Sequence, residues 1–260
     1  MMRTLIVANW KMNKNLAEAS QFIQDLLAIW KAGGPGAHST EVVIAPPYTA
    51  LSPTGEALTG SPLRLAAQDV SAHKEGAFTG EVSAGMLADI GCEYGLVGHS
   101  ERRSGAFESN AIVAQKAEQL CLNGLKPIVC VGETLGDRES GDTAEVVLEM
   151  LRSSLPPPGT PGRDKLVVAY EPVWAIGTGL TASPEQAQAV HAIIRDCLEE
   201  EMGEAGKRTR ILYGGSVNPQ NVKSILSQND IHGVLVGGAS LDAIEFGRIF
   251  GYLDSEDLPS

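Results

Sequence analysis

Three side chains of complementary chemistry each follow a short apolar run in this sequence: Lys11, His99 and Glu171. A carboxylate that touches a carbon beside a carbonyl group can take its proton, and an imidazole can donate a hydrogen bond to the oxygens. An ammonium group stabilises negative charge that develops there, and Asn9 adds a hydrogen-bond donor next to Lys11. These residue types suit general acid–base chemistry with charge stabilisation, provided that the fold brings them together.

Glycine-rich turns follow two apolar runs late in the chain. Gly237 and Gly238 follow the last run, and a Gly-Gly pair precedes Ser216 after the run before it. Glycine lets peptide N–H groups approach an anion without a side chain in the way. Two such turns after consecutive late strands predict a phosphate site of the kind found in α/β barrels.

The elements that must position these residues are short runs rich in Val, Ile and Leu, which mostly do not alternate with polar residues. Such runs are typical of parallel strands buried on both faces. The predicted strands are 4–8, 41–45, 63–67, 94–97, 127–131, 166–170, 210–212 and 234–236. Amphipathic stretches lie between them, and the clearest predicted helices are 16–31, 111–123 and 183–202.

Eight strand–helix units in 260 residues allow about 32 residues each, which is what a βαβ unit requires. The pattern predicts an α/β fold in which eight parallel strands close into a (β/α)8 barrel. We expect one domain over 1–260, with 254–260 as a frayed tail, and a surface loop at the proline-rich segment 156–162. In such barrels the chemistry lies at the carboxyl ends of the strands, where the reactive residues occur.

Composition excludes several other classes. The net charge of −12 repels polyanions, so neither nucleic acid nor an acidic membrane surface is an expected partner. The chain has no apolar run long enough for a transmembrane helix, and its start does not resemble a signal peptide. Its four cysteines form no Cys-x-x-Cys pair, which argues against a disulfide framework or a zinc site and favours a reduced, cytoplasmic protein.

Five segments together resemble the triosephosphate isomerase family, in the family's order and from about residue 5 to residue 249. They are N-W-K-M-N at 9–13, G-H-S-E-R-R at 98–103, Y-E-P-V-W-A-I-G-T-G at 170–179, Y-G-G-S-V at 213–217 and V-G-G-A at 236–239. The resemblance implies a TIM barrel that interconverts dihydroxyacetone phosphate and D-glyceraldehyde 3-phosphate through an enediolate, in glycolysis and gluconeogenesis. No metal is implied, because no Cys/His/Asp cluster has the spacing of metal ligands, and no redox cofactor is implied, because substrate and product have the same oxidation level.

The resemblance also implies roles for individual residues. Glu171 is the expected general base, His99 and Lys11 are the expected electrophiles, and Asn9 assists them. The family places the residue that matches Glu101 beside the active-site lysine. There Glu101 would orient Lys11, assist proton shuttling, or form a purely structural ion pair, and the sequence leaves these alternatives open. Cys130, after the fifth run, is interpreted as a packing residue behind Glu171.

Phosphate binding is expected at Gly177, Ser216, Gly237 and Gly238, with a helix N-terminus after the last strand. The segment 172–179 is the expected lid, with an apolar tip that closes Ile176 toward Glu171 and Leu235. The lid residues are Pro172, Val173, Trp174, Ala175, Ile176, Gly177, Thr178 and Gly179.

A homodimer through the loop 68–81, with Phe78 and Thr79 in the contact, is implied by the resemblance. The sequence itself supports this only in that long loops with an apolar centre are uncommon and often form contacts.

Two departures from the family pattern stand out: Ala106-Phe107 where the family usually has Phe-Gly, and Asn110 where it usually has aspartate. The competing interpretations are another barrel enzyme acting on a phosphorylated metabolite and a non-catalytic barrel that serves as a binding protein.

Overall fold

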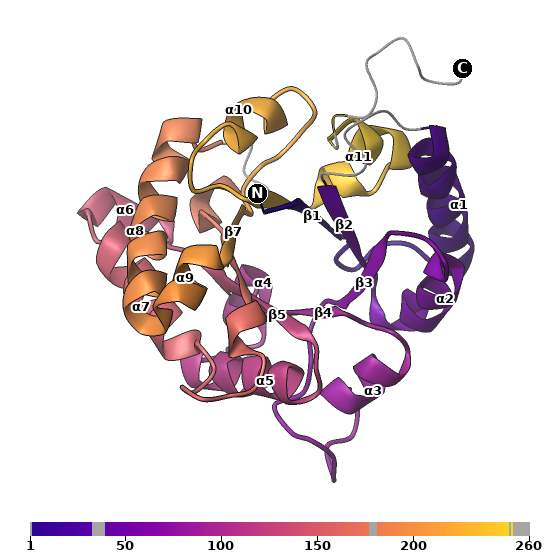
Figure 1. Cartoon of the computed structure of the whole chain (residues 1–260), viewed down its shortest axis with the longest axis horizontal. Helices are drawn as coiled ribbons and strands as arrows, with labels where there is room; N and C mark the ends of the chain where they lie inside the picture. Colours follow the sequence, from indigo (N-terminus) through magenta and orange to yellow (C-terminus); the bar gives the residue numbers. More distant parts are fainter. Residues whose placement is uncertain (1, 33–39, 177–180, 250, 252–260) are drawn as a thin grey trace.

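The computed structural model describes residues 2–32, 40–176, 181–249 and 251 and contains a closed barrel of eight parallel strands in sequential order. Figure 1 looks along the barrel and shows the helices arranged around it. The strands are β1 (Thr4–Asn9), β2 (Thr40–Ala45), β3 (Arg64–Ala67), β4 (Tyr94–Val97), β5 (Lys126–Val131), β6 (Val167–Tyr170), β7 (Arg210–Tyr213) and β8 (Gly233–Val236). Pairing of β1 with β8, in the register Leu5 to Gly233, closes the barrel.

The predicted fold class is confirmed, and each predicted strand end lies within one residue of the observed end. The proline-rich segment 156–162 lies between α7 and β6, as the expected loop. The helices and 3-10 turns are α1 (Leu16–Ala32), α2 (Tyr48–Leu58), α3 (Ala84–Asp89), α4 (Ser100–Gly105), α5 (Asn110–Leu122), α6 (Leu135–Ser140), α7 (Thr143–Ser154), η2 (Arg163–Lys165), η3 (Val173–Ala175), α8 (Pro184–Met202), α9 (Glu204–Arg208), α10 (Val222–Leu226), η4 (Gly238–Ser240) and α11 (Ala243–Ile249).

Local sequence explains where the predicted helices begin and end. Ser183 caps α8 through a reciprocal pair of hydrogen bonds with Gln186, and Pro184 occupies the first helical position. The helix α5 ends at Leu122, and Gly124 follows with a φ of 77°, a conformation that costs glycine little. These signals are local, which is why the sequence predicted these helices closely.

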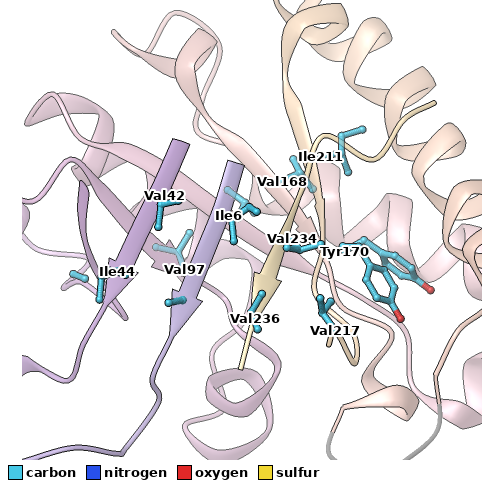
Figure 2. Close-up of a cluster of buried hydrophobic side chains, with 14 of the residues drawn as sticks. Ile6, Val42, Ile44, Val97, Val168, Tyr170, Ile211, Val217, Val234 and Val236 are labelled. Atoms are coloured by element: carbon cyan, nitrogen blue, oxygen red, sulfur yellow. The ribbon is translucent and has the colours of Figure 1, made fainter. Parts of the chain in front are cut away.

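Two apolar layers hold the barrel together. One fills its interior, and it comprises Leu5, Val7, Val43, Ala45, Ala66, Tyr94, Leu96, Ile128, Cys130, Val167, Ala169, Leu212 and Leu235. The other lies between the strands and the helices. Figure 2 shows part of it, with Ile6, Val42, Ile44, Val97, Val168, Ile211, Val234 and Val236 projecting from neighbouring strands. Because each strand is buried on both faces, its sequence is continuously apolar.

His191 on α8 is buried between this helix and the barrel, with its ring edge-on to Tyr170 and its Nδ1 at 3.1 Å from the carbonyl oxygen of Asp230. Burial lowers the pKa of His191 from 6.5 to about 4, so the folded protein holds the ring neutral. Unfolding restores the ordinary pKa, so the stabilisation is complete above pH 6.5 and is lost as the pH falls toward 4.

We therefore expect the wild type to lose about 2 kcal/mol more unfolding free energy between pH 7 and pH 5 than the His191→Gln variant. Urea denaturation at several pH values measures this difference and cancels the contribution of other groups. Parallel pH profiles for the two proteins would contradict the assignment to His191.

Candidate active site

A cavity of about 430 Å³ opens at the carboxyl ends of the strands. It brings together residues from β1, β4, β6, β7 and β8 that are far apart in the sequence. Its walls are Asn9, Trp10, Lys11, Asn13, His99, Glu101, Glu171, Ile176, Gly214, Gly215, Ser216, Val217, Leu235, Gly237, Gly238, Ala239 and Leu241. Every expected catalytic and phosphate-binding residue is in this set except Gly177, which lies outside the described residues.

Glu171 follows β6 directly and is only 2 % exposed. The backbone N–H of Ser100 donates to its Oε2 at 2.9 Å, and Nε2 of His99 lies 3.0 Å from its Oε1. Two glycines make space for this residue: a Cβ on Gly214 would lie 2.9 Å from Glu171 Cγ, and one on Gly132 would lie 1.7 Å from its carbonyl oxygen. The carboxylate is therefore desolvated and held by N–H donors, with neighbouring backbone packed against it.

His99 is the N-cap residue of α4. Its Nδ1 accepts a hydrogen bond from the backbone N–H of Glu101 at 3.2 Å, so Nδ1 carries no proton and the neutral ring carries its proton on Nε2. That N–H points toward Glu171. The orientation of the His99 ring is thus fixed by the start of α4.

Lys11 occupies the first turn after β1 with a φ of 52°, a strained conformation for a residue with a side chain. Asn9 Oδ1 accepts the backbone N–H of Lys11 at 3.0 Å, and Gln68 Nε2 donates to the Lys11 carbonyl at 2.9 Å. Lys11 Nζ lies 2.5 Å from Glu101 Oε1. Its aliphatic chain passes Gly237, where an added Cβ would lie 3.5 Å from Lys11 Cε. The ammonium group is therefore held at the cavity beside the glycine turn.

The glycine turn after β8 differs in one respect from the expectation. The element that follows is the three-residue 3-10 turn η4, where the sequence suggested a helix N-terminus. Beyond it, the described residues contain one helix, α11. The first N–H groups of a 3-10 turn also lack acceptors within the turn, so they retain the capacity to bind an anion, but the helix dipole of a long helix is missing.

The beginning of the expected lid lies within the described residues, whereas Gly177, Thr178 and Gly179 lie outside them. Val173 to Ala175 form η3, and Ala175 is fully buried. Ile176 and Leu235 both line the cavity. The turn covers apolar surface because Ala175 packs inward.

Glu133 is a residue whose role the sequence did not reveal. It is fully buried, and its Oε1 accepts hydrogen bonds from Trp174 Nε1 at 2.9 Å and from Tyr170 Oη at 3.0 Å. Its carbonyl accepts from the backbone N–H of Val173 at 3.1 Å. Glu133 thus fastens the start of the lid segment to the end of β5. These contacts join segments far apart in the sequence, so the role of Glu133 becomes visible only in the folded chain.

Phe107 occupies the position where the family usually has glycine. It is 87 % exposed and has a φ of 55°, in the left-handed region that side chains disfavour. We expect Phe107→Gly to be more stable than Phe107→Ala by about 1 kcal/mol, because both remove the ring but only glycine relieves the backbone strain. Chemical denaturation of the two variants tests this, and equal stabilities would argue against strain at this position.

Within the described ranges, no group of three His, Cys, Asp or Glu side chains is placed to hold a metal ion, and no helix is long and apolar enough to cross a membrane.

Cys130 is completely buried in the barrel interior, and burial, reinforced by the Glu171 carboxylate, raises the pKa of its thiol well above its ordinary value. A neutral buried thiol agrees with the interpretation of Cys130 as a packing residue.

The closed barrel and the grouping of carboxylate, imidazole and ammonium at its mouth define an enzyme of the (β/α)8-barrel class equipped for proton transfer. Residues 4–253 match the sequence profile of the family described as Triosephosphate isomerase. The chain therefore belongs to the triosephosphate isomerase family, whose members are aldose–ketose isomerases.

Individual relatives are similar in sequence to this chain over nearly their whole length. The triosephosphate isomerase of Thermus thermophilus is 49% identical over 247 residues, covering 95% of this chain and 97% of the relative. That of Moorella thermoacetica is 48% identical over 252 residues, covering 97% and 99%. The crystal structure of triosephosphate isomerase from Bartonella henselae superposes with a TM-score of 0.85 at 35% identity and covers 95% of this chain and 98% of that one.

Proposed function

We propose that this chain interconverts dihydroxyacetone phosphate and D-glyceraldehyde 3-phosphate, with Glu171 as the base that moves the proton at carbon. The carboxylate takes a proton from the carbon next to the carbonyl group, and the electron pair of that C–H bond forms an enediolate. Return of the proton to the adjacent carbon completes the isomerisation, so no electrons leave the substrate. The observation that carries this proposal is the convergence of Glu171, His99 and Lys11 on one cavity.

His99 serves the substrate oxygens in this scheme. The hydrogen bond at Nδ1 fixes which nitrogen carries the proton, and the Nε2–H contact with Glu171 must yield before this N–H donates to the substrate. The Lys11 ammonium stabilises the developing oxyanion, and Asn9 adds a hydrogen bond while fixing the backbone of Lys11. Because Glu101 contacts Lys11 Nζ at 2.5 Å, we propose that it orients this ammonium, and the ion pair must yield when the substrate arrives.

The phosphate is held by Ser216, Gly237 and Gly238, with Gly177 added from the lid. Ser216, Gly237 and Gly238 come late in the sequence and line the same cavity as Lys11. Gly237 lies next to the Lys11 side chain. Local N–H groups and one ammonium explain how a chain of net charge −12 holds a dianion. The lid segment 172–179 would then cover the site and bring Ile176 over Glu171, excluding water and strengthening the base.

Turnover of triose phosphate in D₂O by the purified, chelator-treated protein tests the proposal. We expect conversion in both directions and deuterium on the carbon that receives the proton, because an enediolate exchanges its proton with the base and the solvent. Absence of turnover, or conversion with no deuterium incorporated, would contradict proton transfer through an enediolate.

We further propose a homodimer through the loop 68–81. This loop projects from the barrel between β3 and α3 (Figure 1), and His73 stacks on Phe78 near its tip with ring centroids 3.7 Å apart. Met12 is 94 % exposed, and a contact with a partner subunit would remove this apolar side chain from water. Beside it lies a second cavity of about 570 Å³, lined by Met12, Tyr48, Glu101 and Arg102 among others, which could receive such a loop.

Thr79→Arg is expected to shift the particle from dimer to monomer, because Thr79 and Phe78 are exposed on the loop that would enter the partner. Sedimentation velocity measures the change. Ile244→Arg replaces an exposed apolar residue on α11, on the opposite side of the barrel from the loop (Figure 1), and should leave the dimer intact. A wild type that sediments as a monomer, or a dimer insensitive to Thr79→Arg, would contradict this interface.

We also propose that residues 1–260 form a single domain and that the protein works in the cytoplasm, in glycolysis and gluconeogenesis. All eight strands belong to one closed sheet, which supports one domain. All four cysteines are free and buried, which suits a reducing compartment. Activity in the cytosolic fraction of fractionated cells tests the location.

A further inference from the structure

We propose that Lys14 is a positioning residue for the substrate phosphate: its side-chain nitrogen holds the carboxyl end of the glycine turn η4, which keeps the N–H groups at the start of that turn in place. The inference rests on the proposed phosphate site at Gly237 and Gly238. Lys14 is not among the residues that line the substrate cavity, so it acts through the turn and not on the substrate.

The backbone of Lys14 has a φ of 72°, in the left-handed region that disfavours residues with a side chain. Glycine adopts this conformation at little cost, so a lysine here carries strain that glycine would avoid. Strained residues persist where the surrounding structure compensates for them, and they cluster at functional sites. We therefore infer that the Lys14 side chain makes contacts that offset this strain.

The side chain of Lys14 reaches from the turn after β1 to the turn after β8. Its Nζ donates a hydrogen bond to the Leu241 carbonyl at 2.7 Å. The same Nζ lies 4.7 Å from the ring centroid of Phe22 and 5.4 Å from that of Trp10, distances at which an aromatic ring attracts a cation. Both rings are buried and pack edge to face, so they form a fixed support for the end of the lysine.

The Leu241 carbonyl is a group that requires a donor from outside its own turn. Leu241 is the C-cap residue of η4, and carbonyls at the end of a helical turn have no N–H partner within it. In the part of the chain that the structure describes, this carbonyl accepts from Lys14 and from no backbone N–H. Lysine side chains commonly supply this missing bond at helix ends.

The turn η4 is held by a lysine at each of its ends. Lys11 passes Gly237 at the start, where an added Cβ would lie 3.5 Å from Lys11 Cε, and Lys14 binds Leu241 at the end. Between them, the backbone N–H and the hydroxyl of Ser240 both donate to the Gly237 carbonyl, at 2.8 and 2.6 Å. Because these bonds make η4 one unit, release of its carboxyl end would also displace the N–H groups at its start.

An ordinary surface ion pair does not explain the placement of Lys14. Burial lowers the pKa of Lys14, and the carboxylates of Glu18 and Asp242 oppose this. Both carboxylates cap helices: Glu18 Oε2 accepts a backbone N–H before α1 at 2.8 Å, and Asp242 Oδ1 accepts two at the start of α11 at 2.8 and 2.9 Å. Within the described ranges neither forms an ion pair with Lys14, so its hydrogen bond goes to the Leu241 carbonyl.

The test compares ligands with and without a phosphate group in the Lys14→Met variant, which keeps most of the aliphatic stem and removes the donor. We expect the inhibition constant of inorganic phosphate to rise about five- to twentyfold and kcat/KM for D-glyceraldehyde 3-phosphate to fall by a similar factor. With D-glyceraldehyde, which lacks the phosphate, kcat/KM measured by deuterium incorporation in D₂O should change by less than about twofold.

Lys31→Met is the matched control. It removes the same side chain from an exposed position in the last turn of α1, a helix of 17 residues that is about 25 Å long and begins just after Lys14. We expect it to change the inhibition constant of phosphate by less than about twofold, because solvent screens a charge at that distance.

Lys14→Gly separates the contact from the strain, because it removes the side chain and also relieves the backbone. We expect its inhibition constant for phosphate to agree with that of Lys14→Met within about twofold, since both lack the bond to Leu241. Wild-type affinity for phosphate in Lys14→Gly would overturn the proposal. An equal loss with D-glyceraldehyde in Lys14→Met would also overturn it, because the disturbed group would then be Lys11.

Ionic strength separates positioning from attraction at a distance. The ratio of the inhibition constants of Lys14→Met and wild type should persist in about 0.5 M NaCl, where charges that are not in contact are screened. A ratio that falls to one would mean that Lys14 attracts phosphate only as a distant charge, and the positioning role would be overturned.

The proposed phosphate site and this inference fail in different ways. A wild type that inorganic phosphate does not inhibit would remove the phosphate site and this inference with it. A wild type that phosphate inhibits, with the same inhibition constant in Lys14→Met, would overturn the role of Lys14 alone.

Discussion

Replacing Glu171 by glutamine is expected to lower kcat by about 10³–10⁴-fold with little change in KM, because the amide retains the shape of the carboxylate but cannot take a proton. The side chain is buried and held by the N–H groups of Ser100 and His99, so the substitution should leave the fold intact. Steady-state kinetics with either triose phosphate, together with circular dichroism of the variant, provide the measurement.

Glu171→Asp is the graded control. It keeps the carboxylate but withdraws it by one methylene group, and a displacement of that size is expected to cost about 10²-fold. A positioned base therefore predicts that kcat falls from the wild type to the aspartate variant and again to the glutamine variant. A glutamine variant as active as the aspartate variant would mean that the carboxylate of Glu171 does not move the proton.

The Lys11→Met variant is expected to lose about 10²–10³-fold in kcat/KM, because it removes a preorganised positive charge from the site where the oxyanion forms. Lys11 is well placed for this effect: Asn9 and Gln68 fix its backbone, and its side chain passes Gly237. Methionine retains most of the aliphatic chain. Substrate binding and turnover should both suffer, because the proposed role of Lys11 involves both the phosphate and the oxyanion.

A complication of Lys11→Met is that it leaves Glu101 without its partner, and an unpaired carboxylate would itself repel the substrate. The double variant Lys11→Met/Glu101→Gln removes that charge. If Lys11 acts directly, the double variant should regain at most about tenfold; recovery of most of the activity would mean that the stranded charge of Glu101 caused the loss.

Much of the fold and site could be predicted because the determining features are local in the sequence. Strands such as β4, at Tyr94–Val97, are buried on both faces and therefore appear as short apolar runs. The barrel geometry then assigns the residue after each run to one rim, which is why His99 and Glu171 could be placed together before any coordinates. The site-specific roles, in contrast, came from the family resemblance.

The features that the sequence could not reveal depend on contacts across the barrel. Gln68 reaches the carbonyls of Lys11 and Ala45, and nothing in its own neighbourhood indicates this. Gly214 was recognised as part of a glycine turn, but its closest constraint is the space that Glu171 occupies. The hydrogen bond from Lys14 to the Leu241 carbonyl likewise joins segments that only the folded chain brings together.

The hydrogen bond between the Glu101 amide and His99 Nδ1 both initiates α4 and selects the protonated nitrogen of the ring. Local fraying of this six-residue helix would release Nδ1, and the imidazole would then exchange between its two neutral forms, of which only one donates toward Glu171. Warming the enzyme should thus erode activity in a pre-transition, below the temperature at which the barrel itself melts.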